Sequence, residues 1–318
     1  MKSTFMVRFV NRFFSNMAVQ EAELAKVPGA VQPNAYSPLR FEIIQEKFKL
    51  GDDTKNPKVI PVLAKMMSGV NRSIKSIKDN PTQPKTHIAE HLLCEFENYV
   101  ISLGACSIGY THLPAQWVFQ NKAALFPNVI VLTMKMDRER INTSPSQEAE
   151  YTVLATYRDL GIITNKAVEF LRKHGFSVQA GHPLNGQTLY PPLAQLAGLG
   201  QLAYSGLIIT PEFGPCVRLS ALYTSIENLP FNGGNEHAWI EDYCASCGVC
   251  VRKCPAGAIY SEPIRHEHGQ ITYVDNEKCF PYFHYNHGCS VCIKVCPFNH
   301  VPYDKLKEKK MHMNEDIV

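Results

Sequence analysis

The sequence lacks the long apolar segments and the one-sided charge that would place a protein in a membrane or on nucleic acid. Its 318 residues carry a formal net charge of only +3. No basic stripe interleaved with aromatic residues occurs, so nucleic acid is not an expected partner. No run of about 18 apolar residues is present, so no transmembrane helix is expected. With 45% hydrophobic residues, the chain can bury one large core, or one core and a small appended module.

Export signals are also missing from the first twenty residues. They contain neither a twin-arginine pattern nor a secretory apolar run with a cleavage site. They hold Lys2, Arg8 and Arg12 but no acidic residue. We interpret residues 1–30 as an N-terminal helix or extension packed on the core, with a membrane-surface helix or an organelle presequence as alternatives. A cytoplasmic protein is expected, and peripheral membrane association through this segment stays open.

Cysteine is abundant but unevenly placed. The chain has 11 cysteines. Eight of them lie between Cys244 and Cys296, whereas the preceding chain holds only Cys94, Cys106 and Cys216. A disulfide scaffold spreads its cysteines through a small domain that lacks a core. The crowding therefore predicts metal ligands in a reducing compartment.

Two copies of a ferredoxin-type motif account for the crowded cysteines. In two-cluster ferredoxins the fourth cysteine of each run ligates the other cluster. Zinc sites use two C-x2-C pairs instead, and the Cys-Pro ending of both runs disfavours them. Two such clusters lie within tunnelling distance, so the module is predicted to carry electrons one at a time. The runs are Cys244-x2-Cys247-x2-Cys250-x3-Cys254-Pro255 and Cys279-x9-Cys289-x2-Cys292-x3-Cys296-Pro297. They predict one 4Fe–4S cluster on Cys244, Cys247, Cys250 and Cys296, and another on Cys254, Cys279, Cys289 and Cys292.

Upstream of the cysteines, short apolar runs alternate with helical patterns, which indicates a mixed α/β domain. Strands are predicted at 106–110, 128–133 and 176–180. Between the last two, Ser144 is predicted to cap a helix that breaks near Gly161 and ends at a C-cap glycine, Gly175. The division that follows is an α/β domain at 31–235, a ferredoxin-like module at 236–304 and a charged, solvated tail at 305–318.

Glycine and proline are dense between residues 181 and 215. Glycine lets the backbone adopt turns and approach other groups closely. The stretch is consistent with backbone lying against a flat or bulky group, and a set of tight turns is the alternative.

Several of these segments together resemble the cobalamin-dependent reductive dehalogenases. The resemblance covers roughly residues 104–299. Epoxyqueuosine reductases, a related family with the same cofactors, share the Ala-Gly-Leu-Gly element and the cluster module. The matching segments are Met136-Asp137 leading into Thr143-Ser-Pro145, Tyr157 before residues 170–176, Ala197-Gly-Leu-Gly200, residues 206–215 with Arg218-Leu219, and Val274-Asp275 through Cys279 to Cys296-Pro297-Phe298.

The resemblance implies a nitroreductase-like domain that binds a cobalamin against the ferredoxin-like module. Cob(I)alamin would attack or reduce a substrate on the open face of the corrin. The family typically holds its cobalamin base-off, and this chain has no Asp-x-His-x-x-Gly motif to supply a histidine to cobalt. Cofactor contacts are expected at Gly198, Leu199, Gly200, Gly206, Thr210, Pro211, Glu212 and Gly214.

The resemblance also implies a catalytic trio of Tyr157, Asn185 and Arg218. A tyrosine has an ordinary pKa of about 10, so it can deliver a proton to a carbanion-like carbon or a leaving group. A nearby arginine stabilises the phenolate that remains, and an asparagine orients the phenol or the substrate. The alternative is that Tyr157 is a core residue and that Arg218 pairs with Glu212.

The predicted function is a cobalamin- and iron–sulfur-dependent reductase of a small organic substrate. Whether this substrate is an organohalide stays open. An external ferredoxin or flavodoxin is the expected electron donor. The alternatives are an epoxyqueuosine reductase-like enzyme that modifies transfer RNA, and a ferredoxin-type protein that only transfers electrons or reduces a corrinoid.

Overall fold

The computed structural model describes residues 22–33, 58–120, 122–231, 233–267 and 269–315. The N-terminal prediction for residues 1–20 lies outside this part of the chain. The first domain is built on a four-stranded sheet in the order β1-β2-β6-β3, and all its neighbouring pairs are antiparallel. The strands are β1 (Ser107–His112), β2 (Asn128–Lys135), β3 (Val178–Gly181) and β6 (Val217–Thr224).

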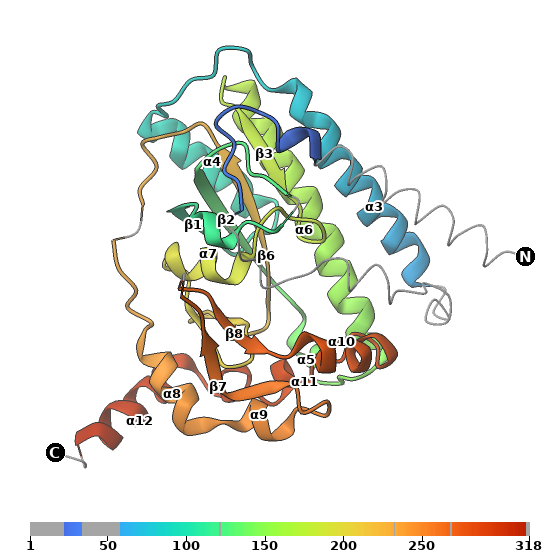
Figure 1. The fold of residues 1–318 in the computed structure, drawn as a ribbon, viewed down its shortest axis with the longest axis vertical. Coiled ribbons are helices and arrows are strands. Elements are labelled where there is room, and N and C mark those ends of the chain that lie inside the picture. Colours follow the sequence, from blue (N-terminus) through green and yellow to red (C-terminus); the bar gives the residue numbers. More distant parts are fainter. Residues whose placement is uncertain (1–21, 34–57, 121, 232, 268, 316–318) are drawn as a thin grey trace, which may run out of the picture.

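Side chains alternate between the two faces of this sheet, as the two-residue period of a strand requires. Ile130, Leu132 and Leu222 face the larger apolar core. Val131 and Tyr223 face a second core on the other side. Helices cover both faces, so the domain has three layers (Figure 1). Two short strands, β4 (Gln201–Leu202) and β5 (Ile208–Ile209), pair with each other in a separate antiparallel ribbon.

The first core lies between the sheet and the long helices. α6 (Gln147–Lys173) and α4 (Glu90–Ser102) contribute apolar residues to it, and α3 (Val59–Lys75) packs against α6. The second core is closed by α7 (Tyr190–Leu196), whose Leu193 and Ala194 are buried. Short elements connect these layers: η1 (Ser76–Asp79), η2 (Ala115–Trp117) and α5 (Arg138–Ile141).

Helix α6 departs from the sequence prediction at two points. Its N-cap is Ser146, whose Oγ accepts a hydrogen bond from the backbone N of Ala149 at 3.1 Å, so the predicted cap at Ser144 was wrong. The predicted break near Gly161 was also wrong, because the helix continues unbroken to Lys173. Gly175, with φ of 93°, does follow the helix end as predicted.

Gly161 allows a buried side chain to pack closely against helix α6. The buried ring of His182 lies between Gly161 of α6 and Gly69 of α3, and a Cβ on Gly161 would lie 2.1 Å from His182 Nε2. Burial lowers the pKa of His182 to about 4, so the ring is neutral at physiological pH. Close contact between helix and imidazole therefore explains a glycine inside a helix.

The cysteine-rich module packs at one end of the sheet (Figure 1). Three polar contacts tie it to the segment before and at the start of α6: Lys294 Nζ to the Ser144 carbonyl at 2.8 Å, Asn299 Nδ2 to Asn142 Oδ1 at 2.7 Å, and His287 Nδ1 to Glu150 Oε2 at 3.3 Å. The module contains α8 (Trp239–Cys247), α9 (Val249–Lys253), β7 (Ile259–Arg265), β8 (Ile271–Val274), α10 (Asn276–Tyr285), α11 (Val291–Lys294) and η3 (Pro297–Asn299), and α12 (Tyr303–Glu315) follows it.

We predict that Gly161→Ala destabilises the protein by about 1–3 kcal/mol, although the same change in an open helix stabilises by about 1 kcal/mol. The added methyl group would collide with His182. Thermal unfolding of the anaerobic protein, followed by circular dichroism, measures the effect. In a double-mutant cycle with His182→Ala, the two changes should cost less together than the sum of their separate costs. A more stable Gly161→Ala protein would contradict the packing role.

Candidate metal and redox centre

The structure brings the predicted cysteines together as two sets. A small cavity is lined by Cys244, Cys247, Cys250 and Cys296, with Tyr243 and Phe298 beside them. These four come from α8, α9 and the turn before η3. Thus Cys296, which is remote in sequence, joins the first run as the exchange of fourth ligands predicted.

The second set gathers in the same way around Cys292. Burial, together with the charges of Cys289, Cys279, Cys250 and Cys254, raises the pKa of the Cys292 thiol to about 12. Burial also raises the pKa of Cys279 to about 11, and among the charges that act on it that of Cys254 is the largest, followed by those of Cys289 and Asp275. Cys254 thus lies near Cys279 of the second run, although it ends the first.

Both sets suit a cluster of iron and sulfide. Buried thiolates that repel one another need a compensating positive charge, which iron supplies. In the described part of the chain, no three His, Cys, Asp or Glu side chains converge on the position of a single metal ion. A 4Fe–4S cluster is a cube held at four corners, so its cysteines stand apart around it. Backbone N–H groups add further donors: the amide of Ala258 lies 3.4 Å from Cys254 Sγ.

Two members of the predicted catalytic trio lie together at the boundary between the domain and the module. The guanidinium carbon of Arg218 stands 4.9 Å from the centre of the Tyr157 ring. Tyr157 also packs in an apolar cluster with Leu207, Cys216 and Cys292. Tyr157 and Cys292, a residue of the second cysteine set, thus border the same apolar cluster. The contact with the Tyr157 ring positions the Arg218 side chain without an ion pair to Glu212, the pairing that the sequence offered as an alternative.

Asn185, the third member of the predicted trio, lies in the turn after β3, where its backbone N donates to the His182 carbonyl at 3.1 Å. Its side chain contacts Lys122 in the described structure, and neither Tyr157 nor Arg218 joins that contact. Lys122 Nζ donates two hydrogen bonds, one to Asn185 Oδ1 at 2.8 Å and one to the carbonyl of Gly186 at 3.0 Å. Lys122 is 5% exposed, which is rare for lysine. Sequence reasoning missed Lys122, because one lysine in a loop carries no pattern.

The predicted cofactor contacts have other partners in the structure. A Cβ on Gly200 would lie 2.1 Å from the carbonyl oxygen of Ile209, and one on Gly214 would lie 2.3 Å from that of Phe298. Thr210 Oγ1 donates to the Gly214 carbonyl, and Leu199 packs in the second core. Gly198 and Gly206 have φ of 73° and 72°, while Pro211 and Glu212 are exposed. Tight turns and close backbone contacts thus account for the glycines of this segment.

Several buried polar atoms have no hydrogen-bond partner in the described structure. Native proteins pair most such atoms, so each is a candidate contact for a polar group or water. Arg218 Nε is one of them, and it belongs to the arginine beside Tyr157. Ser144 Oγ and Asn299 Oδ1 belong to residues that join the domain and the module, whereas His182 Nε2 lies between α3 and α6.

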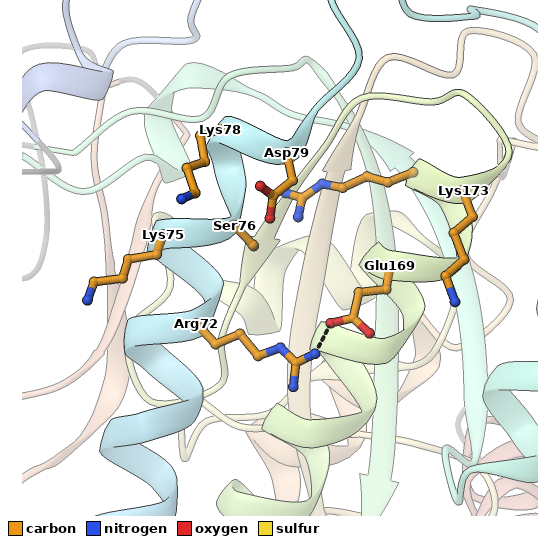
Figure 2. Close-up of a pocket in the computed structure, with 8 residues that line it drawn as sticks. Arg72, Lys75, Ser76, Lys78, Asp79, Glu169 and Lys173 are labelled. Carbon is orange, nitrogen blue, oxygen red and sulfur yellow. Dashed lines mark hydrogen bonds and ion pairs between the residues drawn. The ribbon is translucent and has the colours of Figure 1, made fainter.

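A charged pocket lies elsewhere, between the C-terminal ends of α3 and α6. Glu169 already pairs with Arg72, and Lys75 and Lys78 point away from that pair (Figure 2). Arg172 donates to Asn80 Oδ1 and to the Val178 carbonyl. Because this pocket is at the end of the domain remote from the cysteines (Figure 1), it is not part of the redox centre.

We predict that Cys292→Ser lowers the iron content of the protein by about half, because one of the two four-iron clusters loses a ligand. Cys216→Ser is the matched control: Cys216 is buried in the same apolar cluster but belongs to neither set, so its variant should keep all its iron. Iron and acid-labile sulfide are measured on anaerobically prepared protein. Equal loss in both variants would contradict the assignment of ligands.

Comparisons with known proteins agree with this geometry. Residues 243–300 match the 4Fe-4S dicluster domain family. A tetrachloroethene reductive dehalogenase of Desulfitobacterium hafniense is 34% identical over 187 residues, which are 55% of this chain and 33% of that protein. One from Sulfurospirillum multivorans is 33% identical over 183 residues, 54% of this chain and 35% of that protein. An epoxyqueuosine reductase of Listeria monocytogenes is 32% identical over 114 residues, 34% of this chain and 28% of that protein.

Among solved structures, the catabolic reductive dehalogenase NpRdhA aligns with a TM-score of 0.64 at 17% identity. The alignment covers 79% of this chain and 38% of that one. The chain spans about a third of the length of the curated dehalogenases it matches. No helix in the described residues is long and apolar enough to cross a bilayer. The predicted fold class is confirmed as an α/β domain followed by a module for two 4Fe–4S clusters, and so is the resemblance of this chain to the reductive dehalogenases.

Proposed function

We propose that the chain is the redox core of a cobalamin- and iron–sulfur-dependent reductase that acts on a small organic substrate, with organohalides as the first class to test. One observation carries the proposal: Tyr157, a proton-bearing side chain under the Arg218 guanidinium, borders the same apolar cluster as Cys292, a predicted iron ligand. We infer from this a proton donor near a source of single electrons. Reduction of an organic molecule needs both.

The boundary between domain and module suits a large group with many polar substituents. Cobalamin carries amide side chains around its ring, and these would pair with the partnerless buried atoms of Thr133, Thr152 and Arg218. We assign the cofactor to this boundary, base-off, with residues 198–214 closing one side. When bound, cobalamin would supply a low-potential cobalt centre that can reduce a carbon–halogen bond. The relatives named as reductive dehalogenases support this assignment.

The residues of the chain would donate the proton and orient the substrate. A tyrosine ordinarily holds its proton at neutral pH, so Tyr157 can donate it from Oη to the reduced substrate. The guanidinium of Arg218 over the ring attracts the negative charge left on the phenolate. Lys122 fixes the orientation of the Asn185 amide: an ammonium group only donates hydrogen bonds, so Asn185 Oδ1 faces Lys122.

Electrons would come from an external one-electron carrier such as a ferredoxin or flavodoxin. They would enter at the first cysteine set and pass to the second, whose Cys292 borders the same apolar cluster as Tyr157. The cytoplasm is the proposed location, because thiolate-bound clusters persist in reducing compartments.

We expect Tyr157→Phe to lower turnover of an organohalide by about 100-fold or more, the usual contribution of a positioned general acid. Phenylalanine keeps the ring under Arg218 but removes the proton. Tetrachloroethene, which names several relatives, is the first substrate to assay. Tyr151→Phe, on the same helix, is the control and should keep its activity. Full turnover by Tyr157→Phe, with both clusters intact, would remove the tyrosine from the mechanism.

Cobalt content separates this enzyme from a simple electron carrier. After anaerobic reconstitution with hydroxocobalamin and desalting, we expect one cobalt for every two clusters and the absorption spectrum of base-off cobalamin. Arg218→Met should weaken retention of the cofactor, because it removes a buried donor. Protein that held both clusters but retained no cobalt would instead be a one-electron carrier.

A further inference from the structure

The two cysteine sets have different surroundings. Cys292 of the second set borders an apolar cluster that Tyr157 also borders. Cys244 and Cys296 of the first set lie in an apolar cluster with Trp239, Phe298 and Leu306, and with Ala203 and Ile209 of the preceding domain. Figure 1 shows α8 and α12 on one side of the module and α10 and α11 on the other. The first set is thus the one closer to the surface that carries α12.

The first turn of helix α12 packs against the part of the module that holds the first cysteine set. Leu306 is 5% exposed and packs in the same cluster as Cys244. Tyr303 Oη accepts a hydrogen bond from Trp239 Nε1 at 2.9 Å and lies 2.8 Å from His237 Nδ1. Beyond this turn the helix projects away from the module (Figure 1). Its outer surface is therefore exposed yet rigidly connected to the cluster ligands.

The described side chains of α12, residues 303–311, are predominantly basic. The basic residues are Lys305, Lys307, Lys309 and Lys310, and the acidic residues are Asp304 and Glu308. Lys305 and Lys307 flank Leu306, the residue that reaches the cysteine cluster. A helix that binds a membrane surface needs an apolar face toward the lipid, whereas Leu306 and Tyr303 face the protein. The charge thus favours an acidic protein over a bilayer.

We propose that the exposed face of α12 is the docking surface for an acidic one-electron carrier protein. Its reduced flavin or iron–sulfur centre would pass one electron to the cluster on Cys244, Cys247, Cys250 and Cys296. The carrier is oxidised by one electron, the cluster is reduced by one, and no bond forms or breaks. This inference depends on the clusters alone and does not require cobalamin or a substrate.

The test follows reduction of the clusters in the full chain by a reduced acidic flavodoxin, using their visible absorbance in a stopped-flow instrument. Lys305→Glu/Lys309→Glu should lower the second-order rate by about tenfold or more at low ionic strength. The difference should shrink as salt is added. Photoreduced deazariboflavin, a small neutral donor, should reduce both proteins at equal rates.

Lys75→Glu/Lys78→Glu is the matched control, because it makes the same change of charge on exposed residues of α3 and η1, far from the module. It should be reduced nearly as fast as the unaltered protein. Equal slowing in the two variants, or no slowing in the α12 variant, would overturn the proposal. So would α12-dependent binding to phosphatidylglycerol vesicles with an unchanged rate of reduction. None of these results bears on Tyr157 or cobalamin.

Discussion

The structure depends on the exchange of one cysteine between the two halves of the module. Cys296 completes the set begun by the first run, and Cys254 lies with the second. Neither half can therefore complete a cluster site alone, and the clusters must join the halves as they form. Helix α11 packs against α9, and its Cys292 borders the apolar cluster that Tyr157 also borders.

The boundary between domain and module leaves buried polar groups unsatisfied. A buried donor without a partner costs about 1–3 kcal/mol, so several of them together are consistent with a binding site and unusual for a structural interface. Arg218 is the clearest example of an unpaired buried donor, because its guanidinium lies over Tyr157 while its Nε has no hydrogen-bond partner in the described residues. Elsewhere in the domain, the buried ammonium group of Lys122 orients the Asn185 amide.

The sequence alone could not show which structural role each glycine has. The glycine-rich stretch was compatible both with tight turns and with backbone lying against a bulky group. In the structure, Gly200 and Gly214 face backbone carbonyls of Ile209 and Phe298. Gly161, expected to break a helix, instead accommodates His182. In each case the neighbour is remote in sequence or belongs to another element, so composition alone could not distinguish a turn, a close contact and a cofactor cradle.

The sequence by itself determined the number and kind of the clusters, the α/β class and three of the four strands of the main sheet, while the central strand β6 was not predicted. Cysteine spacing, apolar alternation and turn residues are local, and local patterns can be read along the chain. Only the tertiary structure decided that Tyr157 and Cys292 border one apolar cluster, that Lys122 holds Asn185, and that α12 joins the cluster of Cys244. These contacts join residues that are far apart in sequence. They depend on how layers pack, because long-range packing sets which side chains of separate elements meet.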